Sequence, residues 1–212
     1  MSAQNLIDLS VTEFGNRLAE RTPTPGGGSM AAVLVADGCA LGAMAFRFTS
    51  GEKFAAVEGA MARRVEALEA LRKRALPLVD RDSRSYDAVT AAYKLPKTND
   101  AEKAARTAAI QAAMKGALEV PAETMERALE GLRLVAEGLN DVNPNLVSDG
   151  ATGATCLWSA SESALLNVRI NAASIADKAW AKSRLDHCLS LAEEAHRLLA
   201  QAKSAAAKHL PS

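Results

Sequence analysis

Aromatic residues are scarce in this chain, since Phe, Trp and Tyr together make up 4% of its 212 residues. Large rings therefore cannot dominate a core, and the abundant alanine favours helices that pack closely. Net charge is also absent, because 25 Lys and Arg residues balance 25 Asp and Glu residues. This balance gives no electrostatic attraction to nucleic acid or to an anionic membrane, and we expect neither as a partner.

Cysteine is rare, and Cys39, Cys156 and Cys188 lie far apart in predicted helices. Their spacing matches no metal-ligand motif, so we interpret them as small core residues in a reducing compartment. The three histidines all fall in the last predicted helix, away from every motif, and are assigned surface or packing roles. We expect no metal site.

Long hydrophobic runs are few. The first residues lack the basic region and apolar stretch of a secretory signal, which favours a cytoplasmic protein. The run 29–46 is nearly uncharged and approaches the ~20 residues of a membrane span. Asp37 lies at its centre, however, and much of its bulk is Ala and Gly. We therefore expect a buried helix whose small side chains allow close backbone approach.

Helix signals recur along the whole chain, and no segment is convincing as a strand. Ser10 with Glu13 forms a capping box, Asn99 with Glu102 can cap a second helix, and Asp177 a third. Pro77 should interrupt or kink its helix, and Pro121 should mark a kink or a new start. The helices are expected at about 11–22, 29–48, 52–76, 78–93, 99–139, 151–175 and 177–208. We therefore predict an all-α bundle of long antiparallel helices, in which residues 1–212 form a single domain.

Two of these helices, 29–46 and 151–175, are apolar on nearly all sides. They should be central, or they should meet a second copy of the chain, which predicts a homodimer. The second carries Ser159, Ser163, Asn167 and Asn171 at successive i+4 spacing, as a polar stripe on an apolar rod. Buried amides need partners, so this stripe either cross-links neighbouring helices or lines a polar ligand groove.

The segment 22–29 reads Thr-Pro-Thr-Pro-Gly-Gly-Gly-Ser and runs into the first apolar helix. Prolines stiffen the approach, while contiguous glycines admit a ligand against the backbone. The free amides of the helix start then offer a site for an anion or an electron-rich edge. No Gly-Lys-Ser/Thr follows and no strand precedes, which excludes a Walker A loop and a dinucleotide fingerprint. A tight interhelical turn is the alternative.

Several segments together resemble the formiminotransferase-cyclodeaminase family, and within it the free-standing bacterial branch of methenyltetrahydrofolate cyclohydrolases. They keep the family's order and span nearly the whole chain: 23–29, the helix after it, 51–54, 86–89 leading to 95–97, and 143–149. The resemblance implies an all-helical homodimer that binds a tetrahydrofolate at a cleft near the subunit interface, without a metal or further cofactor. Where family members often have a lysine-rich stretch, this chain reads Gly-Glu-Lys-Phe, so Lys53 is the cation there.

The activity that this resemblance implies is hydrolysis of 5,10-methenyltetrahydrofolate to 10-formyltetrahydrofolate. The related reaction, cyclodeamination of formiminotetrahydrofolate with release of ammonia, is the alternative within the family. Both pass through a tetrahedral carbon between the same two nitrogens. A helical dimerisation module without catalytic activity is the alternative from another class.

Asp149 is the first candidate for the acid/base carboxylate, because it follows a proline-containing loop and opens an apolar helix; an ordinary N-cap is its alternative role. Asp82 is the second: it shares a helix face with Tyr86 and, by resemblance, matches an acidic position of the family. A solvated charge in the run 80–84 is its alternative. Lys53 is the third candidate. It could donate to an oxyanion or pair with a folate carboxylate, and a surface lysine is its alternative role.

The expected substrate-binding residues are Pro25, Gly26, Gly27, Gly28, Ser29, Tyr86, Lys97, Asn145, Ser148, Asn167 and Asn171.

Overall fold

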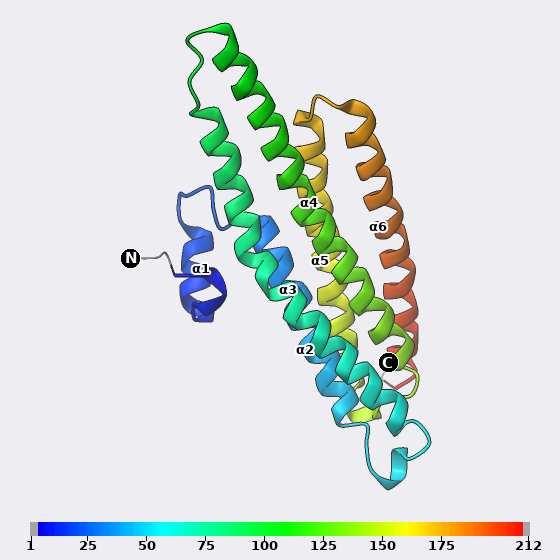
Figure 1. The fold of residues 1–212 in the computed structure, drawn as a ribbon. Helices are drawn as coiled ribbons and strands as arrows, with labels where there is room; N and C mark the ends of the chain where they lie inside the picture. The colour runs from blue at the N-terminus through cyan, green and yellow to red at the C-terminus, as the bar shows by residue number, and fades with distance from the viewer. Residues whose placement is uncertain (1–3, 210–212) are drawn as a thin grey trace.

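The computed structural model describes residues 4–209, and within this range the chain forms helices and no strand. The all-α prediction is confirmed. The long helices run side by side in alternating directions (Figure 1). The α-helices are α1 Val11–Ala19, α2 Gly27–Arg47, α3 Glu58–Tyr93, α4 Asp100–Gly138, α5 Val147–Ser174 and α6 Lys178–Ala207. Three short 3-10 turns are η1 Leu6–Asp8, η2 Glu52–Phe54 and η3 Pro144–Leu146.

The predicted helix caps are present. Ser10 and Glu13 satisfy each other's backbone amides, at 2.9 Å from Ser10 N to Glu13 Oε2 and 3.2 Å from Glu13 N to Ser10 Oγ. The side chain of Asn99 accepts from Glu102 N, and that of Asp177 accepts from Trp180 N. Side-chain acceptors at these positions occupy amides that the first helical turn leaves free.

The interruption expected at Pro77 and the new start considered at Pro121 are absent. Pro77 lies inside continuous α3, and Pro121 lies inside continuous α4. A proline in a helix interior costs about 3 kcal/mol or more, so neighbouring packing must outweigh it. Leu78 and Val79 are buried directly after Pro77, where they form a cluster with Ala32 and Val120. A third difference is that α3 begins at Glu58, after η2, rather than at Glu52.

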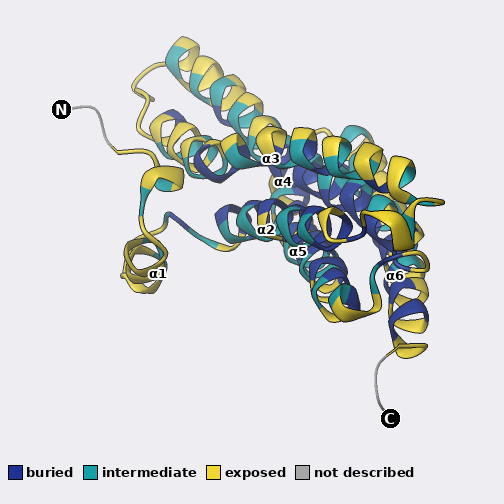
Figure 2. Cartoon of the chain, turned by 90° about the horizontal axis from the view of Figure 1, so that it is seen from below, coloured by how far each residue is buried: buried dark blue, intermediate teal, exposed yellow. Residues whose placement is uncertain are grey.

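α2 and α5 form one side of the bundle and α3 and α4 the other, with α6 against α4 and α5 (Figure 2). α2 and α5 approach so closely that a Cβ at Gly38 would lie 2.9 Å from Gly153 O, and one at Gly153 would lie 2.8 Å from Gly38 O. Larger side chains at these positions would separate the helices. Within residues 4–209, α2 is the one helix long and apolar enough to cross a membrane, yet most of that apolar stretch is buried in the bundle.

Within the described range 4–209, no further helix covers the outer surface of α2 and α5, and this surface carries partly or fully exposed residues. We call it the outer α2–α5 face, and it includes Val33, Asp37, Met44, Cys156, Ser163 and Leu166. Leu166 is 66% exposed and Ile170, one turn further along α5, is 70% exposed. These two large aliphatic side chains lie one helical turn apart and together form an exposed apolar patch, and such patches often mark interaction surfaces.

Candidate functional site

A cavity of about 390 Å³ lies where the glycine segment meets α3, α4 and α5. It collects six of the expected substrate-binding residues: Gly26, Gly27, Gly28, Tyr86, Asn167 and Asn171. Asp82 lies in the same wall. Segments that are more than a hundred residues apart in the chain therefore converge here, which favours a ligand site over an isolated interhelical turn.

The Asp82 carboxylate packs against the first turn of α2. A Cβ added to Gly28 would come within 2.6 Å of Asp82 Cγ, so only glycine leaves room for this carboxylate. The N-cap of α2 is Gly26, which has no side chain with which to cap the helix. Asp82 supplies a negative charge at this helix start from a neighbouring helix, a favourable placement with respect to the helix dipole.

Burial raises the pKa of the Asp82 carboxyl above its ordinary value of 3.8, while hydrogen bonds from the hydroxyl and backbone of Ser29 partly oppose the rise. Removal from water disfavours the charged form of the carboxyl. A raised pKa makes the carboxylate a stronger base, better able to take a proton near neutral pH. Asp82 therefore has the access to the cavity and the raised pKa that an acid/base group needs.

Ser29 lies behind Asp82 and is fully buried. Its Oγ is 3.0 Å from Asp82 Oδ2, 3.0 Å from Val79 O and 3.2 Å from Ser83 Oγ. The sequence placed Ser29 among the residues that contact the substrate. In the structure it stands outside the cavity wall and contacts the carboxylate instead.

The polar stripe of α5 performs both roles that the sequence left open. Asn171 Nδ2 donates to Ala117 O of α4 at 2.9 Å, and Asn167 Nδ2 donates to Ser163 O at 2.9 Å. Both asparagines also line the cavity. Among the described residues neither amide oxygen has a hydrogen-bond donor, so both can accept from a ligand.

Four other predicted site residues lie at the opposite end of the bundle. Asp149 is half-buried in the first turn of α5, with Ser148 and Asn145 exposed beside it. Lys53 is exposed in η2, its Nζ 5.6 Å from the centre of the Phe54 ring. At 1.5 Å rise per residue, Asp149 lies about 33 Å along α5 from Asn171. One protomer therefore does not bring Asp149 to the cavity that contains Asp82.

Two further predicted residues also lie outside the cavity. Lys97 is exposed in the loop between α3 and α4, at the tip of the bundle (Figure 1). Pro25 is buried and lines a second cavity of about 200 Å³ on the other side of the glycine segment. Asp80, Ser83, Arg84 and Asp87 line this second cavity from α3.

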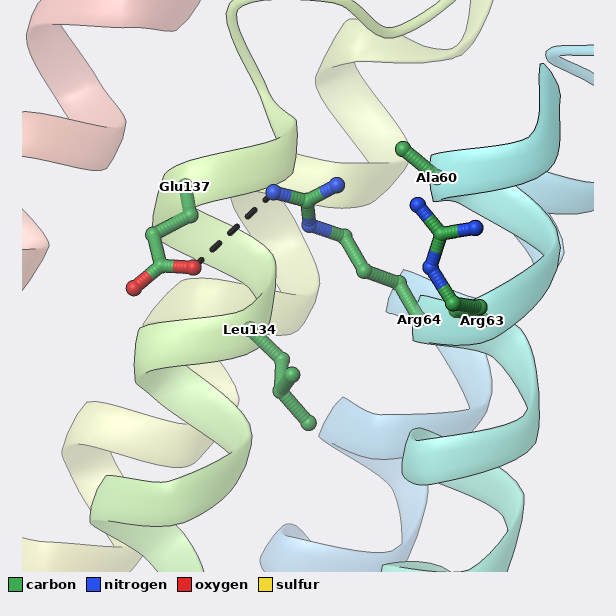
Figure 3. A pocket seen from close by; sticks show the side chains of 5 residues that line it. All are labelled: Ala60, Arg63, Arg64, Leu134 and Glu137. Carbon is green, nitrogen blue, oxygen red and sulfur yellow. Dashed lines mark ion pairs between the residues drawn. The ribbon is translucent and has the colours of Figure 1, made fainter. Parts of the chain in front are cut away.

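A third hollow, of about 340 Å³, lies between α3 and α4 and contains none of the predicted residues. Figure 3 shows Arg64 of α3 facing Glu137 of α4 across it, with their ion pair at 3.9 Å. This ion pair leaves Arg63 as the remaining charged residue that lines the hollow. Among residues 4–209, no three His, Cys, Asp or Glu side chains gather as metal ligands would.

The cysteines are largely core residues, as expected. Burial raises the pKa of the Cys39 thiol to about 12 and that of the Cys188 thiol to about 11. Thiols that stay protonated at neutral pH are poor nucleophiles. Cys156 is only half-buried, on the outer α2–α5 face.

Several lining residues were missed by the sequence reasoning. Ser85 and Val89 share the helix face of Asp82 and Tyr86, so helical spacing was a signal that could have identified them. Ile170 and Ser174 continue the face of Asn167 and Asn171 in the same way. Met114 and Ala117 come from α4, where nothing in the local sequence points to a site.

Comparison with known proteins agrees with this architecture. A sequence model of the formiminotransferase-cyclodeaminase family matches residues 10–190. A methenyltetrahydrofolate cyclohydrolase of Methylorubrum extorquens is 37% identical over 89% of this chain and 91% of that protein. A formimidoyltransferase-cyclodeaminase of Rattus norvegicus is 33% identical over 91% of this chain, which spans 36% of that longer protein.

Among solved structures, the formiminotetrahydrofolate cyclodeaminase of Thermotoga maritima superposes with a TM-score of 0.84 at 29% identity. The match covers 95% of this chain and 97% of that one. Sequence and fold therefore lead to one conclusion: the chain belongs to the formiminotransferase-cyclodeaminase family.

Proposed function

We propose that this chain hydrolyses 5,10-methenyltetrahydrofolate to 10-formyltetrahydrofolate at the cavity beside the glycine segment. The observation that carries the proposal is the partly buried carboxylate of Asp82, held against Gly28 in a wall that also presents two asparagines. The relative from Methylorubrum extorquens, similar over nearly the full length of both chains, supports the choice of reaction. The proposal treats the chain as a single catalytic domain.

The chemistry needs a positioned base rather than an activated electrophile. The one-carbon unit of the substrate bridges N5 and N10 as a cationic amidinium and is already electrophilic. A carboxylate beside this cation stabilises it and takes the proton from water as the water oxygen bonds to the carbon. Collapse of the tetrahedral adduct breaks the bond to N5 and leaves the formyl group on N10.

Asp82 is the better placed of the two candidate carboxylates, because it lines the cavity and its pKa is raised by burial. The amide oxygens of Asn167 and Asn171 can accept hydrogen bonds from a pterin ring. Tyr86, 46% exposed at the rim, can pack against it. Ser29 supports the carboxylate from behind.

Asp149 and Lys53 join this site if two copies pair through the outer α2–α5 face. A two-fold axis near the middle of α2 and α5 places the Asp149 end of one copy beside the Asp82 end of the other. The exposed Leu166 and Ile170 supply apolar surface for such an interface. We therefore propose a homodimer whose sites combine residues of both subunits.

Cyclodeamination of formiminotetrahydrofolate is the second candidate. The fold match to a Thermotoga maritima protein of that activity favours it. The same carboxylate would serve, because N10 attacks the formimino carbon and ammonia departs through a similar tetrahedral intermediate. A non-catalytic dimerisation module would have no use for a partly buried base in a ligand-sized cavity.

The proposal further places the protein in the cytoplasm, with tetrahydrofolate derivatives as ligands and without nucleic acid or membrane partners. No metal or added cofactor is required, because the substrate carries its own positive charge. The test is a spectrophotometric assay of the purified protein with each folate substrate, before and after treatment with EDTA. We expect turnover of 5,10-methenyltetrahydrofolate that survives chelation. Turnover of the formimino substrate alone would favour the second candidate, and turnover of neither would contradict both.

A further inference from the structure

A chain of hydroxyl groups joins the two cavities on either side of the glycine segment. Asp82 lines the larger cavity, and its Oδ2 lies 3.0 Å from Ser29 Oγ. Ser29 Oγ lies 3.2 Å from Ser83 Oγ, and Ser83 lines the second cavity. Both distances allow hydrogen bonds, and Ser29 itself is inaccessible to solvent. The three side chains form a continuous path through the wall.

The geometry points to a proton relay from Asp82 through Ser29 and Ser83 to the second cavity. This inference rests on the proposed function, because the hydrolysis has a proton to dispose of. A methenyl cation and one water give neutral 10-formyl product and one proton. The transfer of hydrogen from the adduct hydroxyl to N5 is internally balanced, so the first proton taken from water remains on Asp82 at the end of the turnover.

A folate in the larger cavity would stand between Asp82 and bulk solvent on that side. The second cavity offers the other route, because its lining residues Arg84 and Asp87 are exposed and connect it to the surface. Proton transfer then needs only the rearrangement of three O–H bonds. Asp82 gives its proton to Ser29 Oγ, Ser29 gives its own to Ser83 Oγ, and Ser83 gives its own to water. Three O–H bonds break and three form, with no oxidation or reduction.

The position of Val79 O explains how the relay resets. Ser29 has one hydroxyl hydrogen, and both the Asp82 carboxylate and Val79 O lie within 3.0 Å of its oxygen. With Asp82 ionised, Ser29 donates to the carboxylate. With Asp82 protonated, the carboxyl donates to Ser29, whose hydrogen turns toward Val79 O or Ser83. The hydroxyl is satisfied in both protonation states, so neither is trapped.

The charges around the exit are balanced, so no net positive charge opposes proton departure. Asp80 and Asp87 line the second cavity together with Arg84 from α3 and Arg17 from α1. The Asp80 carboxylate accepts from the backbone amides of Leu6 at 2.7 Å and Ile7 at 3.4 Å, and these two hydrogen bonds hold it in place. Arg84 donates to Asn5 Oδ1 at 3.0 Å, which turns its charge toward the N-terminal segment.

A matched pair of substitutions tests the relay. Ser83→Thr keeps the hydroxyl, whereas Ser83→Val has nearly the same shape without it. Ser83→Ala adds a smaller variant in case the branched side chain disturbs α3. Ser190→Ala serves as the control, because its exposed hydroxyl donates to His187 O on α6, far from both cavities.

We expect Ser83→Val and Ser83→Ala to lower kcat about tenfold in dilute buffer while folate Kd stays unchanged, since proton release becomes limiting. Concentrated imidazole should restore the rate, and the solvent deuterium isotope effect on kcat should rise. Ser83→Thr and Ser190→Ala should behave like the parent. Full activity of both hydroxyl-free variants in dilute buffer would overturn the relay, as would a loss that no buffer restores.

The experiment distinguishes a failure of the proposed function from a failure of the relay. If the parent turns over neither folate substrate, or if Asp82→Asn keeps the parent rate, the site assignment is contradicted before Ser83 is considered. If Asp82→Asn is inactive while Ser83→Val turns over normally without buffer dependence, the relay alone is overturned.

Discussion

Gly28 and Asp82 fit each other so tightly that a single methyl group at residue 28 would overlap the Asp82 carboxyl group. This contact joins the glycine segment to α3 and fixes the carboxylate against the start of α2. Glycine is needed at residue 28 because the neighbouring Asp82 side chain leaves no room for a Cβ atom, and not because the backbone there requires unusual dihedral angles.

Gly28→Ala should therefore displace the Asp82 carboxylate without unfolding the bundle, because the overlapping atoms belong to the end of a side chain that can rotate. We expect kcat to fall by about 10²-fold, comparable to partial loss of a positioned base. Gly116→Ala is the matched control, since no other group lies within 4 Å of the added Cβ. It should keep the parent kcat and raise the free energy of unfolding by up to about 1 kcal/mol. Equal turnover in the two variants would contradict the proposed role of the contact.

The pH dependence of turnover should reflect the raised pKa of Asp82. Only the ionised carboxylate can accept a proton, so kcat falls as pH drops through the folded-state pKa, which lies above 3.8. Ser29→Ala removes a hydrogen bond that lowers this pKa, and should shift the acid limb of the kcat profile to higher pH. If the acid limb of the kcat profile lies at the same pH in Ser29→Ala and in the parent, the limb reports the titration of a group other than Asp82.

The free energy of unfolding should depend on the same pKa of Asp82. Its Asp82-dependent part should fall as pH rises, whereas kcat should rise. Because the folded-state pKa is raised, the folded state holds more protons than the unfolded state between pH 3.8 and the folded value. The free energy of unfolding of the parent, relative to Asp82→Asn, therefore decreases as pH rises through this window. Urea unfolding of both proteins over a pH series measures the difference.

Much of the fold could be predicted from the sequence because its signals are local. The capping residues Ser10, Asn99 and Asp177 act within one helical turn, and the nearly all-round apolar composition that placed α2 and α5 is a property of single helices. The continuity of α3 through Pro77 was missed, because it depends on burial of the following residues by other helices.

The site was predictable in part for the same reason. The glycine segment, Asp82, Tyr86 and the two asparagines each carry a local signal, and the structure brings them together. What the sequence could not reveal is which end of an antiparallel bundle each motif occupies. Asp149 and Lys53 follow the family order along the chain, yet they fold to the end opposite Asp82.

A mixing experiment tests whether two subunits share the site. In a dimer that combines Asp82 of one copy with Asp149 of the other, an Asp82→Asn subunit paired with an Asp149→Asn subunit retains one intact site. We expect each variant alone to be nearly inactive, and the refolded or co-expressed mixture to recover up to about one quarter of the parent rate, since about half of randomly paired dimers are mixed and each has one intact site of two. Recovery to no more than the average of the two variants would contradict a shared site.

The central claim is that Asp82 is the base that takes the proton from water. The most direct measurement is kcat for 5,10-methenyltetrahydrofolate in the parent and in Asp82→Asn, together with folate Kd for both. We expect Asp82→Asn to lower kcat by about 10²–10⁴-fold while Kd changes little, because the amide keeps the shape of the carboxyl group but cannot accept a proton. Asp82→Asn that turns over at the parent rate, in a folded protein with parental folate affinity, would contradict the account.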